Sequence, residues 1–535
     1  MHLSDVDVCI IGSGASGSIA ANVLARNGLR VLLLEEGERL PKGASLAAAE
    51  VGWEAAYVRD GQGNLSPTGR PWTACALGGG TALYAGISFR LREVDFDARR
   101  FVASDALDPQ WPIRYGDLRP YYDEIERTIG IVRRPGADPL EPPSPSESLP
   151  AHPYSLPGRM LARAGENLGL RPFPTPLAVN SVPYRGRPAC HWCGPCNEHV
   201  CPTGARVDVA AGLLRAADGA LTVATRSRAV RIDLAHPDRA GSVEWLDLRS
   251  RTRRRTRARC VVLAANAVQS AALLLRSTSR WAPAGIGNDH GMLGRGLSFK
   301  VSGYAVGAAC APGAADRTAY GPHSTVALSD HYLAADCASG LGGLLYEASP
   351  EARGVSLGRI SLRVHYVAAD QPMAGNRVRL ANTRDRFGVE RIVLDYRSHP
   401  VDRRRLGHLA ERATDLLSAA GAEDLRQEPS GYERGSRHLH GGCRAGTDPA
   451  TSVVDAGGRG HGVDNVYVID GGYFPFAGGV NPTFTIQANA LRIAYELVRR
   501  LTGRPPRARL SLNLEPDRRP TRTTDDRVSV AQGAQ

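Results

Sequence analysis

The N-terminal part of the chain has two short apolar runs on either side of an apolar-periodic stretch. Residues Val6–Ile11 and Arg30–Leu34 have the length and content of buried strands, and the positions up to Arg26 repeat with a helical period. Asn27-Gly28 provides a turn before the second run. The pattern predicts a βαβ unit, in which a helix connects two parallel strands.

Later segments predict further strands and helices. A strand followed by a helix is expected at Cys260–Leu275, alternating strands of an antiparallel sheet at Ile360–Val367 and Arg377–Leu380, a helix at Arg403–Ala420, a short buried strand at Val466–Asp470, and a helix at Pro482–Arg499 with Pro in its first turn. Residues 134–158 are rich in Pro and Ser and predict a long surface connection. The polar chain from Gly503 is expected to be disordered.

Length and charge add two constraints. The chain has 535 residues, more than one hydrophobic core normally serves, so at least two domains are expected. Its net charge is +12, and nearly all of the positive charge is arginine. The densest run, Arg251–Arg259, lies between strand-like segments at Ser242–Leu248 and Cys260–Ala264, which predicts a solvated hairpin tip. No nucleic-acid-binding motif accompanies the arginines, so no nucleic-acid partner is expected.

The N-terminus lacks a basic start, and its apolar run is only strand-length, so no signal peptide is expected. No run approaches the ~20 apolar residues of a membrane helix. These features predict a cytoplasmic protein without membrane insertion. In a reducing compartment the ten cysteines would be thiols or metal ligands rather than disulfides.

The turn after the first predicted strand reads Gly12-Ser13-Gly14-Ala15-Ser16-Gly17. This is the dinucleotide-binding pattern GxGxxG in its proper context, with a strand before it, a helix after it, and Glu35 at the end of the next strand. Gly12 would allow the tight turn, Gly14 the approach of a pyrophosphate, and Gly17 close helix–strand packing. Phosphates would bind at the helix N-terminus, and Glu35 would accept ribose hydroxyls. The motif does not separate FAD from NAD.

Several later blocks resemble the glucose–methanol–choline (GMC) oxidoreductase family. They are a second glycine loop at Leu77–Gly86, the segment Cys260–Ser270, and an ordered C-terminal series at His438–Gly446, Ser452–Asp455, Val468–Gly472 and Gly479–Thr483. The resemblance runs from about residue 5 to 500. It implies FAD as the cofactor. Because residues 71–100 contain no histidine for a covalent link, the FAD is expected to be non-covalent.

Shorter stretches resemble a narrower group, the flavin-dependent 6′-alcohol oxidases of aminoglycoside antibiotic biosynthesis. They are Asp60–Gly63, Gly294–Leu297, Asp330–Cys337 and His438–Asp455. The likeness implies oxidation of the primary 6′-hydroxyl of a paromamine-like amino sugar to the aldehyde, with molecular oxygen or an external electron acceptor as the second substrate. A polycationic substrate of a +12 protein would require a locally acidic pocket.

The resemblance also assigns roles to single residues. Hydride leaves a carbinol carbon readily only when the hydroxyl proton leaves too, so the site needs a base. The family's base position is His438, and its second position, which hydrogen-bonds the substrate oxygen, is Asn481. Because asparagine cannot take a proton, the base role falls on His438, with His440 as the rival two residues away. For FAD the matching motifs give Gly79, Gly80, Thr81, Val230, Asp470, Gly471, Pro482 and Thr483 in addition to the first glycine turn and Glu35.

Cys190, Cys193, Cys196 and Cys201-Pro202 resemble the ferredoxin run C-x₂-C-x₂-C-x₃-C-P with one extra residue. Three interpretations stay open: an iron–sulfur cluster that relays electrons to an external acceptor, a tetrahedral zinc site, or reduced thiols in a loop that caps the FAD.

The expected fold class is α/β, with a Rossmann-type FAD-binding domain interleaved in sequence with an α+β substrate domain that contains an antiparallel sheet. The FAD-binding domain is assigned to 1–94, 191–300 and 436–502, the substrate domain to 95–190 and 301–435, and a disordered tail to 503–535. Other hypotheses are a GMC dehydrogenase of another sugar or alcohol, a flavin monooxygenase or NAD(P)H-dependent reductase, which would need a second nucleotide site, and a non-catalytic metal or nucleic-acid binder.

Overall fold

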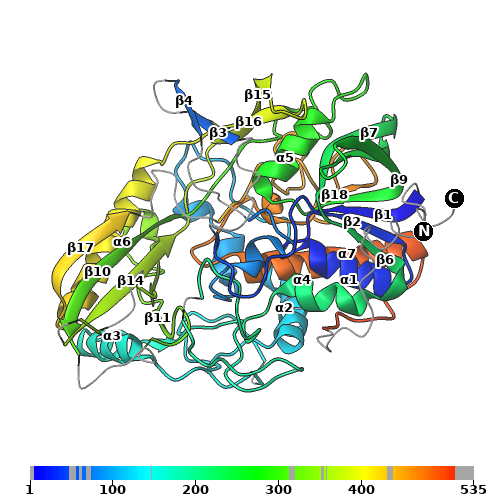
Figure 1. The fold of residues 1–535 in the computed structure, drawn as a ribbon. Coiled ribbons are helices and arrows are strands. Elements are labelled where there is room, and N and C mark those ends of the chain that lie inside the picture. Colours follow the sequence, from blue (N-terminus) through cyan, green and yellow to red (C-terminus); the bar gives the residue numbers. More distant parts are fainter. Residues whose placement is uncertain are drawn as a thin grey trace.

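The structure is a computed structural model, shown as a ribbon in Figure 1. It describes residues 5–46, 56–59, 63–67, 74–145, 147–194, 196–311, 320–350, 355–356, 358–429 and 438–512. Three sheets and the helices that cover them make up the described part of the chain.

The first sheet contains the predicted βαβ unit and five more strands. Its members are β1 (Asp5–Ile11), β2 (Val31–Leu34), β6 (Leu221–Ala224), β7 (Ser227–His236), β8 (Arg239–Asp247), β9 (Thr252–Leu263) and β18 (Val466–Val468). The strands β6, β2, β1, β9 and β18 run parallel, and β7, β8 and the first half of β9 form an antiparallel meander. The parallel strands are apolar because both faces are covered.

Most of the arginine run lies inside β9, so its prediction as a hairpin tip was wrong. Only Arg251, at φ +56°, stands in the turn after β8. Along β9 the arginine side chains alternate with buried positions such as Thr256 and Ala258, which is the period of a strand with one solvated face. The solvated arginines pair with acids of neighbouring strands, as Arg253 does with Glu244.

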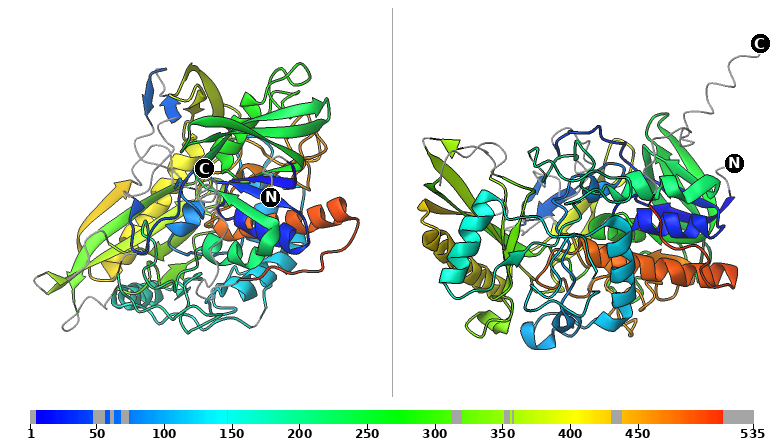
Figure 2. Two further views of the ribbon diagram at one scale, coloured as in Figure 1. Left: turned by 45° about the vertical axis from the view of Figure 1, so that its right-hand side comes forward. Right: turned by 90° about the horizontal axis from the view of Figure 1, so that it is seen from below.

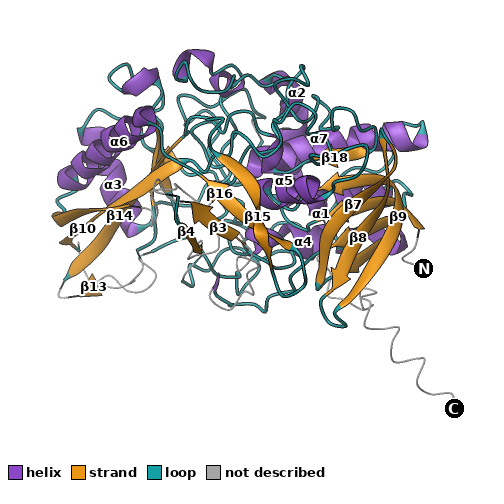
Figure 3. Cartoon of the chain, turned by 90° about the horizontal axis from the view of Figure 1, so that it is seen from above, coloured by secondary structure: helices purple, strands orange, loops and turns teal. Residues whose placement is uncertain are grey.

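The second sheet is antiparallel and contains the predicted strand Ile360–Val367, whereas the other predicted strand, Arg377–Leu380, lies in a third sheet. It contains β5 (Phe173–Pro174), β10 (Val301–Cys310), β11 (Val326–Leu328), β12 (Gly343–Glu347), β13 (Val355–Ser356), β14 (Arg359–Ala368) and β17 (Glu423–Pro429). The long helix α6 (Pro400–Ala419) packs across β10, β14 and β17, with α3 (Leu156–Asn167) beside it. Figure 3 shows α6 lying over this sheet, away from the first sheet. The other face of the sheet is therefore turned toward the first sheet.

A third sheet connects the two regions, and Figure 1 shows it along the upper edge. It contains β3 (Ala56–Arg59), β4 (Leu65–Pro67), β15 (Arg377–Arg384) and β16 (Glu390–Asp395), with β3 parallel to β16. Strands β3 and β4 come from the range assigned to the FAD-binding domain, whereas β15 and β16 come from the range assigned to the substrate domain. Backbone pairing therefore crosses the predicted division of the chain.

The remaining helices are α1 (Gly17–Arg26), α2 (Tyr115–Ile129), α4 (Val209–Leu213), α5 (Ala267–Arg276) and α7 (Thr483–Thr502). Helix α1 packs on β1 and β2, with α7 against it and α2 against α7, an arrangement that Figure 2 shows from below. Pro482 stands at the N-cap of α7, one position before the helix. None of the helices in the described ranges is long and apolar enough to cross a membrane.

The chain just after α7 is ordered, which corrects the expectation of a disordered tail for residues 503–512. Asn22 and Asn27 of α1 exchange hydrogen bonds with the backbone of Ser511 and Ala508, and Leu510 is buried. The side-chain amides of one helix residue and of its C-cap residue thus pair with backbone groups of a segment that composition alone predicts to be disordered. The rest of the predicted tail lies outside the described residues.

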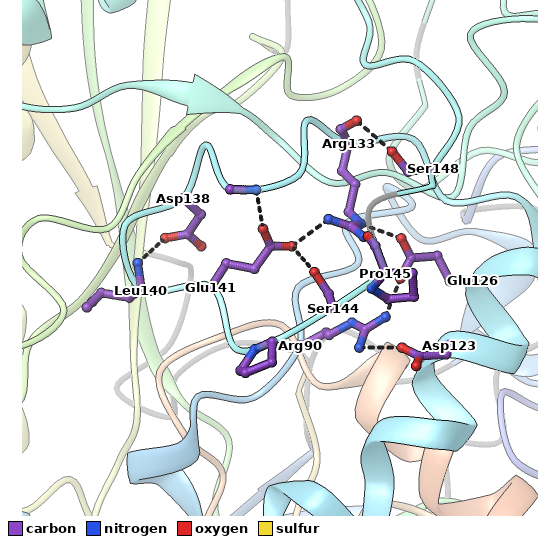
Figure 4. Close-up of polar contacts among 12 residues, drawn as sticks. Arg90, Asp123, Glu126, Arg133, Asp138, Leu140, Glu141, Ser144, Pro145 and Ser148 are labelled. Carbon is purple, nitrogen blue, oxygen red and sulfur yellow. Dashed lines mark hydrogen bonds and ion pairs between the residues drawn. The ribbon is translucent and has the colours of Figure 1, made fainter.

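The long connection 134–158 is partly buried, because a network of charged side chains fixes its first half to α2 (Figure 4). Glu126 of α2 accepts hydrogen bonds from both Arg90 and Arg133, and these three side chains are 3–4% exposed. Arg90 also contacts Asp123 at 2.8 Å, and Arg133 contacts Glu141 at 2.9 Å. Burial of so many charges is tolerated only because each one is paired.

Replacing Glu126 by Gln is therefore expected to destabilise the protein strongly. The change leaves Arg90 and Arg133 buried with too little negative charge, at a cost of about 3–5 kcal/mol. Glu496→Gln is the matched control, since its pair with Arg499 is exposed on both sides and contributes well under about 1 kcal/mol. Thermal unfolding followed by circular dichroism measures both, and equal midpoints for the two variants would contradict the role of the network.

Candidate functional site

The first glycine turn connects β1 to α1 and has no space for side chains at two of its glycines. Gly12 has φ +97°, and a Cβ atom there would lie 2.5 Å from the Ala264 carbonyl oxygen. A Cβ atom on Gly17 would lie 1.9 Å from the carbonyl oxygen of Gly12. The turn, with Ala15 and Ser16 at the start of α1, therefore packs backbone against backbone and directs the helix N-terminus away from the strand end.

The second glycine loop lies directly against the first. A Cβ atom on Gly79, which has φ +51°, would lie 3.0 Å from the Gly14 Cα atom, whereas the Cβ position of Gly80 faces open space. The Gly78 N–H donates to the Ser13 hydroxyl at 2.9 Å, and the Thr81 hydroxyl donates to the Gly78 carbonyl at 2.6 Å. Two segments far apart in sequence thus form one continuous backbone surface.

Glu35 lies at the end of β2, beside this surface. Its carboxylate accepts hydrogen bonds from the Ser13 hydroxyl at 2.6 Å, the Ser13 N–H at 3.0 Å and the Gly37 N–H at 2.9 Å. Burial raises the pKa of Glu35 to about 7. Val230 lies on β7 and packs in a small apolar cluster with Leu246 and Val389. Its assignment to the adenine stays a prediction.

The C-terminal motifs contact one another, and with the two glycine turns they make up the two walls of the candidate site. Asp470 is buried, accepts hydrogen bonds from the Ser270 hydroxyl at 2.6 Å and the Gly472 N–H at 2.8 Å, and burial raises its pKa to about 6. A Cβ atom on Gly471 would lie 2.3 Å from the Leu439 carbonyl oxygen. The segment that carries the two histidines therefore runs alongside Asp470 and Gly471. Thr483 begins α7 at the same wall, directly after Pro482.

Two of the three predicted catalytic side chains meet. The Asn481 Nδ2 atom lies 3.4 Å from the His438 Nε2 atom and 3.3 Å from the Tyr346 hydroxyl. Asn481 is 7% exposed, and its Oδ1 atom has no hydrogen-bond partner within the described ranges. A buried carbonyl oxygen without a partner is a site where a ligand hydroxyl could donate.

His440 has different surroundings. Its ring is fully buried and stacks on Phe474 with centroids 5.4 Å apart. Its backbone pairs with Ser298. Burial, together with the nearby charges of Lys300 and His438, holds the pKa of His440 well below its ordinary value, so the ring is neutral at physiological pH. The geometry brings His438, and not His440, to Asn481.

A buried lysine holds the loop that carries Asn481. Lys300, which is fully buried at φ +60°, donates from its Nζ atom to the carbonyl oxygens of Ala477, at 2.7 Å, and Gly478. The Gly479 N–H donates to the Tyr332 hydroxyl at 2.7 Å, and that hydroxyl donates to the buried carboxylate of Asp95. Burial lowers the pKa of Lys300 to about 7, against the attraction of nearby carboxylates.

The cysteine segment packs on the second glycine loop without forming a metal site. The Arg206 side chain connects the two, donating to the carbonyl oxygens of Ala82 and His199. Cys193 is exposed, while Cys190, Cys196 and Cys201 are half-buried thiols. Within the described residues no group of three or more His, Cys, Asp or Glu side chains is placed to hold a metal ion. Neither the iron–sulfur nor the zinc interpretation gains support.

The residues fit an FAD. The two glycine turns expose backbone at Gly14 and Gly80, where an added Cβ atom would meet no atom nearer than 4.0 Å, and Glu35 follows β2 at the position where this motif has its ribose acceptor. The opposite wall presents the unpartnered Asn481 Oδ1 atom.

Sequence reasoning missed four of the side chains that shape this site. Ser13 was inside a recognised motif, but only the fold shows that it connects the two glycine loops. Lys300 carried a signal, because it is one of two lysines in a chain rich in arginine. Tyr346 and His365 lie on the second sheet, where nothing in the sequence distinguishes them from other strand residues.

Comparison with known proteins identifies relatives over nearly the whole chain. Models described as GMC oxidoreductase match residues 10–301 and 372–490. Paromamine 6′-oxidase of Streptomyces fradiae is 46% identical over 508 residues, 93% of this chain and 93% of the relative. 6‴-Hydroxyparomomycin C oxidase of Streptomyces lividus is also 46% identical, over 93% of this chain and 92% of the relative. The crystal structure of pyridoxine 4-oxidase from Mesorbium loti shares the fold, with a TM-score of 0.64 at 22% identity, over 92% of this chain and 99% of that one.

The raised pKa of Glu35 predicts a pH-dependent stability. Between the ordinary carboxyl value of 4.5 and about 7 the folded chain binds more protons at Glu35 than the unfolded chain. Stability from this group is therefore present below pH 4.5 and is lost as the pH rises through 7, by about 3 kcal/mol. Glu35→Gln should flatten the stability profile of flavin-stripped protein across this range.

Glu38→Gln is the control, because Arg226 and Arg249 lower the pKa of Glu38 and its loss cannot flatten the profile. Thermal midpoints at pH 5 and pH 7.5 give the measurement. An unchanged pH dependence in Glu35→Gln would show that Glu35 is ionised in the folded protein across the range.

Proposed function

The chain belongs to the GMC oxidoreductase family of FAD-dependent enzymes that oxidise CH–OH groups, and on this premise we propose that it converts the primary 6′-hydroxyl of a paromamine-like amino sugar to the aldehyde. The substrate is proposed from the high identity to two enzymes named for oxidation of such compounds. The reaction is proposed on one observation above all, the contact of His438 with Asn481 beside an unpartnered amide oxygen.

His438 is assigned the base. A neutral imidazole can take the hydroxyl proton at its Nε2 atom, and this atom faces the Asn481 amide at 3.4 Å. Asn481 cannot take a proton, but its unpartnered Oδ1 atom can accept a hydrogen bond from the substrate hydroxyl and orient it toward His438. Its Nδ2 group would stabilise developing negative charge by donating to the oxygen in place of Tyr346 or His438. Tyr346 accepts a hydrogen bond from the same amide and fixes its orientation. The loop contacts of Lys300 and Tyr332 keep Asn481 in place during the reaction.

The cofactor is held by the residues of the two walls. The glycine turns with the start of α1 would bind the pyrophosphate, Glu35 the ribose, and the segments at Asp470–Gly471 and Pro482–Thr483 the region nearest to His438. When bound, the flavin supplies the acceptor for the hydride of the carbinol carbon. The two electrons and two protons taken from the alcohol then reduce molecular oxygen to hydrogen peroxide. An electron relay through the cysteine segment is not part of the proposal, since the described thiols form no group that is placed to hold a metal ion.

The proposed function is tested by anaerobic spectroscopy of the purified holoenzyme before and after addition of paromamine. Loss of the visible flavin bands is the expected result, followed by their return and the formation of hydrogen peroxide when air is admitted. Bands that stay oxidised with paromamine but bleach with another alcohol would overturn the substrate and keep the family. Bleaching without peroxide in air would replace oxygen by another acceptor.

Replacing His438 by Ala is expected to lower kcat by roughly 10²–10⁴ while the flavin stays bound, because the proton acceptor is lost and the cofactor walls are not touched. His440→Leu is the comparator, since its buried ring stacks on Phe474, whereas the hydrogen-bond contacts described for Asn481 are with His438 and Tyr346. Stopped-flow measurement of flavin reduction gives the rates, and flavin absorbance per protein gives the occupancy. A larger loss in His440→Leu than in His438→Ala would transfer the base role to His440.

A further inference from the structure

Three aromatic side chains form a row across the second sheet and end at Asn481. His365 on β14 is the register partner of Tyr304 on β10 and of Tyr346 on β12. The His365 ring stacks on Tyr304 with centroids 4.4 Å apart, and it meets Tyr346 edge to face at 4.8 Å. The Tyr346 hydroxyl then accepts the hydrogen bond from Asn481. His365 is therefore connected to the candidate catalytic amide through one ring.

The row lies on the face of the sheet that is turned away from α6. Leu362, Val364 and Tyr366 of β14 pack in the apolar core that includes helix residues such as Leu409. Because neighbouring strand residues point to opposite faces, His365 points to the other side. Tyr346 belongs to the core shared with the first sheet, which confirms this direction. The row thus faces the region of the cofactor walls.

His365 is buried without a full set of hydrogen bonds. It is 7% exposed, and its Nε2 atom has no hydrogen-bond partner among the residues that the structure describes. Such an atom costs free energy unless a ligand or water pairs with it. The Asn481 Oδ1 atom is in the same condition at the other end of the row. Both atoms are closed to solvent, so each would gain a hydrogen bond only from a ligand group that reaches it.

The His365 ring is neutral and can accept a hydrogen bond. Burial, with the charges of His323, His438 and Arg363 nearby, holds the pKa of His365 well below its ordinary value, so the ring is neutral at physiological pH. Arg363, stacked on Tyr304, is itself paired with Glu428 at 3.1 Å. A neutral imidazole nitrogen can accept a proton-bearing group of a polycation without repelling it.

We propose that His365 is a substrate-binding residue whose Nε2 atom accepts a hydrogen bond from a ring hydroxyl or amino group of the sugar, while the reacting hydroxyl lies at His438 and Asn481. The proposal rests on the proposed oxidation of an amino sugar, and it identifies His365 as a residue that contributes to recognition of that sugar. The aromatic rings of Tyr304 and Tyr346 flank the position and exclude water, which strengthens the hydrogen bond.

The test compares His365→Leu, His365→Gln and Tyr366→Phe as holoenzymes with paromamine. His365→Leu is expected to raise KM roughly tenfold to a hundredfold with a much smaller change of kcat, because only substrate binding loses a hydrogen bond. His365→Gln keeps a polar group near the Nε2 position and should recover most of the loss. Tyr366→Phe removes one hydroxyl from the next residue of β14, on the face that packs against α6, and should leave KM unchanged.

Deoxy and deamino analogues of paromamine identify the partner group. With the analogue that lacks the group contacting His365, wild-type protein and His365→Leu should show the same KM. An unchanged KM in His365→Leu, or a loss that Gln does not recover and that persists with every analogue, would overturn the proposal and leave His365 a packing residue. If wild-type flavin is not reduced by paromamine, the proposed substrate has failed on its own, and the same variants are compared with the alcohol that does reduce it.

Discussion

The approach of two glycine turns to van der Waals distance is the constraint on which the rest of the site depends. Gly79 lies so near Gly14 that a side chain on it would meet backbone, and Gly17 has no room beside the Gly12 carbonyl. The contact connects the N-terminal βαβ unit to a loop that also receives the cysteine segment through Arg206. A surface made of backbone would let a phosphate approach peptide N–H groups closely, which side chains at these glycine positions would prevent.

The two side chains proposed for catalysis, His438 and Asn481, lie in loops rather than in helices or strands, so contacts with other side chains have to hold them in place. Lys300 holds two successive carbonyl groups before Asn481, and the Tyr332–Asp95 pair fixes the next N–H group. A buried ammonium is costly, and in this place it satisfies carbonyl oxygens that a glycine-rich loop cannot pair within itself. This burial of Lys300 stabilises the loop that carries Asn481, where a small shift would separate the Asn481 amide from His438.

Short sequence patterns predicted correctly those elements whose structure depends on neighbouring residues alone. The strand–turn–helix around Gly12 was predicted correctly, because period and glycine spacing act within a short segment. The arginines of β9 were misplaced, since their pairing with acids on other strands depends on tertiary contacts. His438 and Asn481 were found by motif, yet the contribution of Tyr346 and His365 follows from register across β10, β14 and β12, which one sequence does not display.

The distribution of charge bears on how a strongly basic chain could bind the amino sugar that is proposed as its substrate. The arginines of β9 are paired at the surface, and Arg90 and Arg133 are paired in the interior. Around Asn481 the described partners are an imidazole and a phenol, and His365 is kept neutral by burial. Uncharged acceptors in an apolar setting can accept a hydrogen bond from a sugar hydroxyl without the repulsion that a charged histidine would add, whereas an ammonium group of the same sugar would still need a carboxylate or water as its partner. Net charge describes the whole surface, whereas binding depends on the few groups that burial has left unpaired.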